Sequence, residues 1–396
     1  MVSMLLQVET IPNEFENLLV YTKAFRYPTI EEIWNQICSG MDTISIGLNV
    51  GLDVEKLKNS SRPNKYEVKL ISGKVMKKDM PKRGDIMLLS KRGLNSSDQI
   101  IKAGSFCTIL VVTLVNDHVE DYPASMHVWL SQSPYGGSPN DQTSYQVMHL
   151  TNLITFAHSW EVITGGFKEN PHIVDAMLAR NENVDNMLQA DGKFTDKDFG
   201  LNKSQRDAVE SCFSASECSK HSVRLIWGPP GTGKTKTASV FLLMILKSLR
   251  THRTLVCAPT NTALVQLASR FVCLLEESTE TSYLLADVIM FGSNKHMDTN
   301  NNLSKILLDH RAKEKHARNK LLENAKLVFC TPCGSSRLTK NQQYDTLVID
   351  EAAYLKECES LIPLAIRGIK HVVLIGDDKQ LQPVVKSPVC LHYKTI

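Results

Sequence analysis

One stretch of the sequence decides how this chain folds: Gly228-Pro229-Pro230-Gly231-Thr232-Gly233-Lys234-Thr235. It fits the pattern G-x-x-x-x-G-K-[ST], a glycine-rich loop whose backbone N–H groups cradle phosphate. Residues 222–227 before it are mostly apolar and predict a strand, and residues 235–249 after it predict a helix. The N-terminus of that helix would point at the bound anion. This order of strand, loop and helix is the context that distinguishes a phosphate-binding loop from a glycine-rich turn that matches by chance.

Downstream of this loop, apolar runs of strand length alternate with helical stretches. The runs lie at 254–258, 287–291, 327–330, 346–349 and 372–375. Such alternation predicts an α/β fold with a parallel, doubly wound sheet, in which ligands bind at the carboxyl ends of the strands. We therefore expect the chemistry of residues 201–396 to gather at one edge of one sheet.

Acidic and amide residues follow two of these predicted strands. Asp350 and Glu351 come directly after the strand at 346–349, and Gln380 follows the next one. Asp350 would hold Mg²⁺ through its water shell, Glu351 would polarise an attacking water, and Gln380 would contact the γ-phosphate or that water. On the other side, Lys234 would reach the β- and γ-phosphates and Thr235 would bind Mg²⁺. Taken alone, the acidic pair could be a helix cap and Gly376–Gln380 a turn.

An amide precedes the loop, in Leu201–Gln205. The side chain of Gln205 offers a donor and an acceptor, which suits the edge of an adenine base. Ser204 and Gln205 could equally cap the helix predicted at 206–213.

Hydroxyl and amide groups also occupy two strand-to-helix junctions. Pro259, Thr260 and Asn261 follow one strand, and Ser335 follows another. Each group alone would be a helix cap, but two of them on one sheet edge could grip a phosphodiester backbone. They predict a track for single-stranded RNA or DNA.

The first half of the chain has a different pattern. We expect a helical stalk segment at 1–65, a β-rich, barrel-like accessory domain at 66–145, and stalk helices with a linker at 146–200. Residues 56–92 hold twelve Lys/Arg against three Asp/Glu. That basic stretch fits a nucleic-acid face and a solvated surface about equally well.

The bulk composition is that of an ordinary globular chain, with a net charge of +3 and 42% hydrophobic residues. Its ten cysteines have irregular spacing, which favours reduced thiols in an intracellular compartment. No basic, then apolar, leader opens the chain, and the apolar run at 240–246 is too short to span a bilayer. We expect no membrane partner.

Together these segments resemble superfamily 1 helicases, in the branch of the nonsense-mediated-decay helicase and senataxin, with plant senataxin-like members the most similar. The segments are LNKSQ (201–205), GPPGTGKT (228–235), APTNTAL (258–264), DEAA (350–353) and GDDKQLQP (376–383). The resemblance implies a RecA-like ATP-binding domain at 201–396, ATP and Mg²⁺ as cofactors, and nucleic-acid contacts at Pro259, Thr260, Asn261 and Ser335. For the nucleotide it implies Gln205, Gly228, Pro229, Pro230, Gly231, Thr232, Gly233, Lys234, Thr235 and Lys236. For catalysis it implies Lys234, Asp350, Glu351 and Gln380, with Thr235 and Asp350 on the metal.

The chain departs from this family in several places. Tyr354 stands where a glutamine is usual, and Pro332-Cys333-Gly334 replaces small hydroxyl residues. A Cys/His zinc module is missing from the N-terminal region, and the sequence stops at Ile396, where a second RecA-like domain would follow. We therefore expect nucleotide binding with slow hydrolysis, and no unwinding by this chain alone.

Three functions remain open from the sequence. The first is an ATP-dependent helicase, an ATP hydrolase of RNA processing or decay, placed in the nucleus rather than the cytoplasm. The second is a non-unwinding regulatory module, or decaying paralogue, that binds ATP and RNA. The third, a P-loop ATPase acting on protein, is disfavoured by APTN and by Gln205.

Overall fold

The computed structural model describes residues 8–42, 48–56, 65–72, 81–90, 107–116, 125–131, 144–165, 170–178, 199–277, 284–292, 302–338 and 342–393. The chain forms two compact units. Unit 1 comprises Met1–Val8, Tyr27–Ala157 and Lys386–His392, and unit 2 comprises Glu9–Arg26, His158–Val385 and Tyr393–Ile396. No helix within the described ranges is long and apolar enough to cross a membrane.

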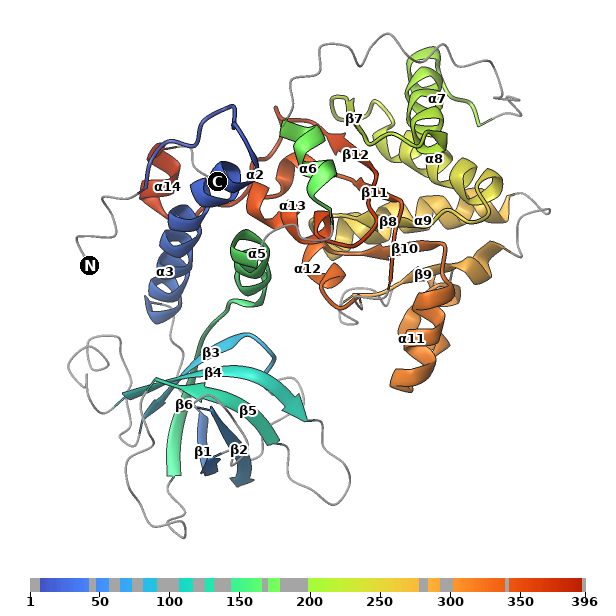
Figure 1. Ribbon diagram of the computed structural model, residues 1–396. Helices are drawn as coiled ribbons and strands as arrows, with labels where there is room; N and C mark the ends of the chain where they lie inside the picture. Colours follow the sequence, from blue (N-terminus) through green and yellow to red (C-terminus); the bar gives the residue numbers. More distant parts are fainter. Residues whose placement is uncertain are drawn as a thin grey trace. The chain divides into compact units, whose positions relative to one another are not determined.

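Unit 2 contains a six-stranded sheet. Its strands lie in the order β7 (Ser222–Trp227), β12 (His371–Gly376), β11 (Thr346–Ile349), β8 (Thr254–Cys257), β10 (Leu327–Cys330) and β9 (Val288–Met290) (Figure 1). Every pairing is parallel, so all the carboxyl ends meet at one edge. The predicted parallel α/β sheet is confirmed.

Helices cover both faces of this sheet. On one face, α7 (Lys203–Glu217), α8 (Lys234–Ser248) and α9 (Asn261–Glu276) share a core with Val348 of β11. On the other face, Leu347 and Ile349 of the same strand pack with α2 (Leu18–Ala24), α5 (Ile154–Gly165), α6 (Pro171–Leu178) and α13 (Glu357–Leu364). This alternation follows from the pleat of a strand buried on both sides.

Short helices complete unit 2. They are η6 (Leu303–Lys305), α10 (Leu308–Arg311), α11 (Lys315–Asn324), α12 (Pro332–Ser335) and η7 (Ala352–Tyr354). Helix α2 is fastened by a partly buried hydrogen bond, in which the Tyr21 hydroxyl donates to Glu357 Oε1 at 2.7 Å.

Unit 1 is built on a closed antiparallel barrel. Its strands are β1 (Leu48–Lys56), β2 (Lys65–Ser72), β3 (Asp85–Ser90), β4 (Cys107–Asn116), β5 (Ser125–Leu130) and β6 (Ser144–Asn152), joined in the order β1-β2-β5-β4-β3-β6. Val68, Leu110 and Val128 are among the side chains that fill its interior. Closure removes the unpaired strand edges that an open sheet would expose.

A long helix covers part of the outer face of this barrel. Ile37 and Met41 of α3 (Arg26–Asp42) pack on the outward side chains of β3 and β6. Contact with β6 is close enough to require glycine, because a Cβ at Gly40 would lie 2.3 Å from the Leu150 carbonyl oxygen. Gln36 adds a hydrogen bond of 2.8 Å to the Thr151 hydroxyl.

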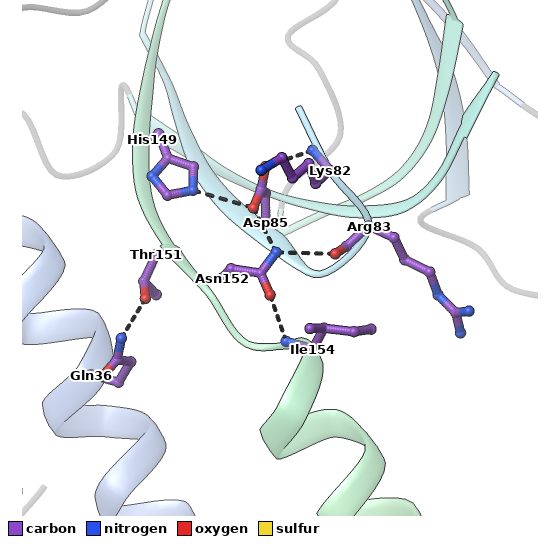
Figure 2. Close-up of polar contacts among 8 residues, drawn as sticks. All are labelled: Gln36, Lys82, Arg83, Asp85, His149, Thr151, Asn152 and Ile154. Carbon is purple, nitrogen blue, oxygen red and sulfur yellow. Dashed lines mark hydrogen bonds and ion pairs between the residues drawn. The ribbon is translucent and has the colours of Figure 1, made fainter. Parts of the chain in front are cut away.

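The turn that leads into β3 is tied to the start of α5 by a polar network (Figure 2). Asp85 accepts bonds from the Lys82 amide at 2.6 Å and from Asn152 Nδ2 at 2.7 Å, and it pairs with His149 Nε2 at 3.2 Å. Although burial acts to raise the pKa of Asp85, the bonds from His149, Lys82 and Asn152 lower it. The bond to Asp85 raises the pKa of His149. This network fixes the Lys82–Asp85 turn of the predicted barrel.

The observed bounds differ from the predicted ones. The barrel extends from Leu48 to Asn152, beyond both ends of the predicted segment 66–145. In Leu48–Lys56 the apolar residues alternate strictly with polar residues or glycine, a period-two pattern that marks a strand rather than a stalk helix. Within the segment 146–200, predicted as stalk helices with a linker, residues 166–169 and 179–198 lie outside the described residues.

Candidate nucleotide and nucleic-acid site

The glycine-rich loop connects β7 to α8 as the sequence predicted. Gly231 and Gly233 have φ of 79° and 84°, values that favour glycine, and Gly233 is the N-cap of α8. The Lys234 ammonium donates to the Gly228 and Pro229 carbonyl oxygens at 2.7 and 3.4 Å. The lysine side chain therefore folds back over the loop that carries it.

Gln205 is already engaged on both sides of its amide. Asn202 is the N-cap of α7, and Gln205 completes a capping box by accepting a bond from the Asn202 amide at 3.0 Å. Gln205 Nε2 donates to the Thr232 carbonyl oxygen at 2.8 Å. The side chain reaches so far into the loop that a Cβ at Gly233 would lie 2.6 Å from it. Gln205 therefore takes part in the cap, as the sequence allowed, but α7 begins at Lys203 and its N-cap is Asn202 rather than Ser204. The same amide joins α7 to the phosphate loop.

Asp350 and Glu351 lie at the carboxyl end of β11, which pairs directly with β12. Asp350 is 3% exposed, and burial, followed by the charge of Glu351, raises its pKa to about 6. Its Oδ1 accepts a bond from the Glu351 amide at 3.0 Å, and the Lys234 charge also acts to lower the pKa. Glu351 is the single non-glycine residue with positive φ, at 50°, in the described part of the chain.

Gln380 lies in the turn after β12, held by Asp377. Gln380 Nε2 donates to Asp377 Oδ2 at 2.9 Å, and this bond is the largest cause that lowers the pKa of Asp377. The charge of Lys234 lowers that pKa as well. Since β7, β12 and β11 are parallel neighbours in the sheet, the residues that follow their carboxyl ends lie at adjacent positions on one sheet edge.

The two predicted nucleic-acid junctions lie on neighbouring strands. Cys257 at the end of β8 is in register with Cys330 at the end of β10, so the segments that follow them start side by side. Thr260 is the N-cap of α9, with its hydroxyl accepting from the Ala263 amide at 3.1 Å, and Asn261 is the first residue of that helix. Pro259 is partly exposed just before it.

Ser335 does not offer its hydroxyl to a nucleic acid in this structure. The residue is fully buried, and its Oγ donates to the Pro332 carbonyl oxygen at 2.6 Å. Thr331 is the N-cap of α12 at this junction. The junction lies at the predicted position, and its four-residue helix turns Ser335 inward.

The structure gives Lys236 and Asn202 structural roles that the sequence did not predict. Lys236 Nζ donates to the Gly200 carbonyl oxygen at 2.7 Å rather than to the loop. Asn202 caps α7, and the spacing of Asn202 and Gln205 could have revealed the capping box.

These features suit a nucleoside triphosphate with Mg²⁺. Left-handed glycines shape the loop, Lys234 supplies a cation, and two adjacent carboxylates follow β11. Fold and site together define a P-loop NTPase of the RecA-like type.

Comparison with known proteins narrows the class. Residues 200–315 and 291–388 match an AAA domain (AAA_11), and residues 4–185 match a domain of unknown function (DUF6469). The chain is 35% identical over 211 residues to the regulator of nonsense transcripts 1 homolog of Neurospora crassa, covering 47% of this chain and 18% of that one. It is 28% identical over 293 residues to the DNA polymerase alpha-associated DNA helicase A of Schizosaccharomyces pombe, covering 63% and 43%. Identity to the ATP-dependent helicase NAM7 of Saccharomyces cerevisiae is 30% over 206 residues, covering 47% and 20%.

Residues 200–388 are therefore similar to superfamily 1 helicases, in the branch of the nonsense-mediated-decay helicase. The chain spans less than half the length of each of these relatives.

Proposed function

We propose that this chain binds ATP with Mg²⁺ and single-stranded nucleic acid as an ATP-hydrolysing, helicase-type protein. The observation that carries the proposal is the adjacency of β7, β12 and β11 in the parallel sheet, because Lys234, Asp377 and Asp350 follow the carboxyl ends of these neighbouring strands. Three neighbouring strand ends at one sheet edge form the arrangement a triphosphate needs.

Each residue has a role that follows from its position. Lys234 would exchange its two backbone carbonyl partners for phosphate oxygens. This exchange is favourable because a hydrogen bond to a charged acceptor is stronger than one to a neutral acceptor. Mg²⁺, when bound, would neutralise phosphate charge, and Thr235 and Asp350 would hold it. Glu351 would orient the attacking water and accept its proton. Gln380 would leave Asp377 to contact the γ-phosphate or the water.

The nucleic-acid side rests on the adjacent ends of β8 and β10. The N-terminus of α9, with exposed Thr260 beside it, presents backbone N–H groups to a phosphodiester. Contacts to the phosphodiester backbone carry no base-sequence information. We therefore propose that the affinity depends on the nucleic acid being single-stranded and on the salt concentration, but not on the base sequence. RNA is the proposed substrate, and single-stranded DNA is the comparison.

Two measurements on the purified chain test the function. We expect Mg²⁺-dependent ATP binding by titration calorimetry that Lys234→Ala abolishes, with Lys247→Ala, a change at an exposed position of the same helix, as the control. Retained binding by Lys234→Ala would contradict the proposal. The second measurement is ATP turnover with and without single-stranded RNA or DNA.

Turnover also separates the two candidate functions. Stimulation by nucleic acid supports the hydrolase. Binding of ATP and RNA with no turnover supports a non-unwinding regulatory module, which the unusual Tyr354 beside the acidic pair favours. We further propose a nuclear rather than a cytoplasmic site of action, with RNA-processing or decay proteins as partners, which imaging of a fluorescent fusion and affinity purification would test.

A further inference from the structure

We infer that Lys236 is a positioning residue for the adenine side of the nucleotide site, acting through the loop at residues 200–205. This inference rests on the proposed function. Its basis is a bond of 2.7 Å from Lys236 Nζ to the Gly200 carbonyl oxygen, which joins residues 36 positions apart in the sequence.

Lys236 does not share the target of Lys234. Each residue of an α-helix turns by about 100°, so side chains two positions apart lie on nearly opposite sides. The ammonium of Lys234 lies over Gly228 and Pro229, whereas that of Lys236 lies against Gly200. The two lysines therefore bind different backbone segments of the site.

The segment that Lys236 binds at Gly200 leads directly to Gln205, whose side-chain amide contacts the phosphate loop. Gly200 adopts φ of 59°, and a Cβ there would lie 3.3 Å from Lys236 Nζ. Two residues later Asn202 opens α7, and Gln205 reaches back to the Thr232 carbonyl oxygen. The loop is thus fastened at both ends, to α8 through Lys236 and to the phosphate loop through Gln205.

A purely structural role accounts poorly for this lysine. A cation in the first turn of a helix opposes the helix dipole, so it does not stabilise α8. The carbonyl that it binds belongs to an exposed residue, so water could satisfy that oxygen equally well. What the bond does provide is a fixed position for the loop before the nucleotide arrives, which reduces the ordering cost of binding.

The test compares ATP with inorganic tripolyphosphate, which has the phosphates but no base. Lys236→Met removes the donor and keeps the side-chain length. We expect its affinity for Mg²⁺–ATP to fall about fivefold, as the loss of one hydrogen bond of ordinary strength gives. Affinity for tripolyphosphate should stay at the wild-type value. Lys247→Met on the same helix is the matched control and should change neither affinity.

A double-mutant cycle adds a second readout. If Lys236 acts through the loop that presents Gln205, then Lys236→Met should cost little more in a Gln205→Ala background, so the two effects will not add. Equal losses for ATP and tripolyphosphate, or additive effects in the cycle, would overturn the inference and leave the proposed function standing. A wild-type chain that binds neither ligand would overturn both.

Discussion

At the scale of single residues, the backbone of Glu351 is strained, with φ of 50°. A non-glycine residue in the left-handed region costs about 1 kcal/mol, and such strain persists only where its surroundings enforce it. Here the Tyr354 amide donates to the Glu351 carbonyl oxygen at 3.0 Å. Gly376 closes against this turn, since a Cβ there would lie 3.2 Å from the Ala353 amide nitrogen. The strain lies at the residue proposed to orient water.

A pair of substitutions measures that strain. Glu351→Gly should be more stable than Glu351→Ala by about 1 kcal/mol, because glycine tolerates φ of 50°. Urea unfolding provides the comparison, and both variants should lose ATP turnover. At the exposed helical position Lys247 the order should reverse, with glycine less stable than alanine by about 1 kcal/mol. The same order at both positions would rule out strain at Glu351.

What the sequence could predict at this scale follows from how local each interaction is. Lys234, Thr235 and Gly233 belong to a contiguous motif with its own backbone geometry, and they lie as predicted. Ser335 depends on the direction of a four-residue helix, and the partner of Gln205 is 27 residues away, at Thr232. Neither the inward direction of Ser335 nor the bond between Gln205 and Thr232 can be predicted from residue types or their spacing, so both became visible only in the three-dimensional structure.

At the scale of elements, the amino ends of the strands in unit 2 carry a pair of neutral histidines. The rings of His252 and His371 stack with their centroids 6.3 Å apart, and they bond to Thr346 and Ser222 at 2.8 and 2.9 Å. Burial first, then the charges of His252 and Lys370, lower the pKa of His371 to about 4, while Asp345 opposes them. Burial also lowers the pKa of His252, with Lys370 acting in the same direction and Asp345 opposing.

This pair predicts loss of stability in mild acid. In the unfolded chain a histidine takes up its proton near pH 6.5, whereas folded His371 resists protonation down to about pH 4. The contribution of His371 to the free energy of unfolding is therefore fully present above about pH 6.5, and it is lost as the pH falls from about 6.5 to about 4. Urea midpoints at pH 7.5 and 5 should differ less in His371→Asn than in the wild-type chain. His316→Asn, at an exposed position, is the control and should keep the wild-type difference.

The contact of α3 with the barrel predicts a second effect at this scale. In Gly40→Ala the new methyl group would meet the Leu150 carbonyl oxygen at 2.3 Å, and backbone cannot yield as a flexible side chain can. We expect a loss of about 2 kcal/mol in unfolding free energy. Gly165→Ala, where nothing lies within 4 Å, should be neutral or stabilising. Equal effects of the two substitutions would show that α3 does not need this approach.

At the scale of the whole molecule, the two family matches do not coincide with the two compact units. Residues 9–26 and 158–178 fall in the DUF6469 match at 4–185, yet they lie in unit 2. Conversely, Lys386–His392 lies in unit 1, where the buried carboxylate of Glu32 accepts the Lys386 and Ser387 amides, each at 2.8 Å. Sequence composition predicted separate segments in chain order, whereas the fold interleaves them, because long-range packing determines which helix covers which face.

Interleaving predicts that neither half folds well alone. A fragment of residues 199–396 keeps the parallel sheet but lacks α2, α5 and α6, whose buried side chains include Tyr21, Ile163 and Ile173. The apolar face beneath them would be open to water, so the fragment should aggregate and bind an apolar dye such as ANS. Residues 1–185 supplied in trans should restore a soluble, dye-silent complex that binds ATP. In the intact chain Ile173→Asp should reproduce the dye binding, while Asp175→Ala, at an exposed position of the same helix, should not. A fragment 199–396 that unfolds cooperatively and binds no dye would show that the helicase half needs no cover from the first half.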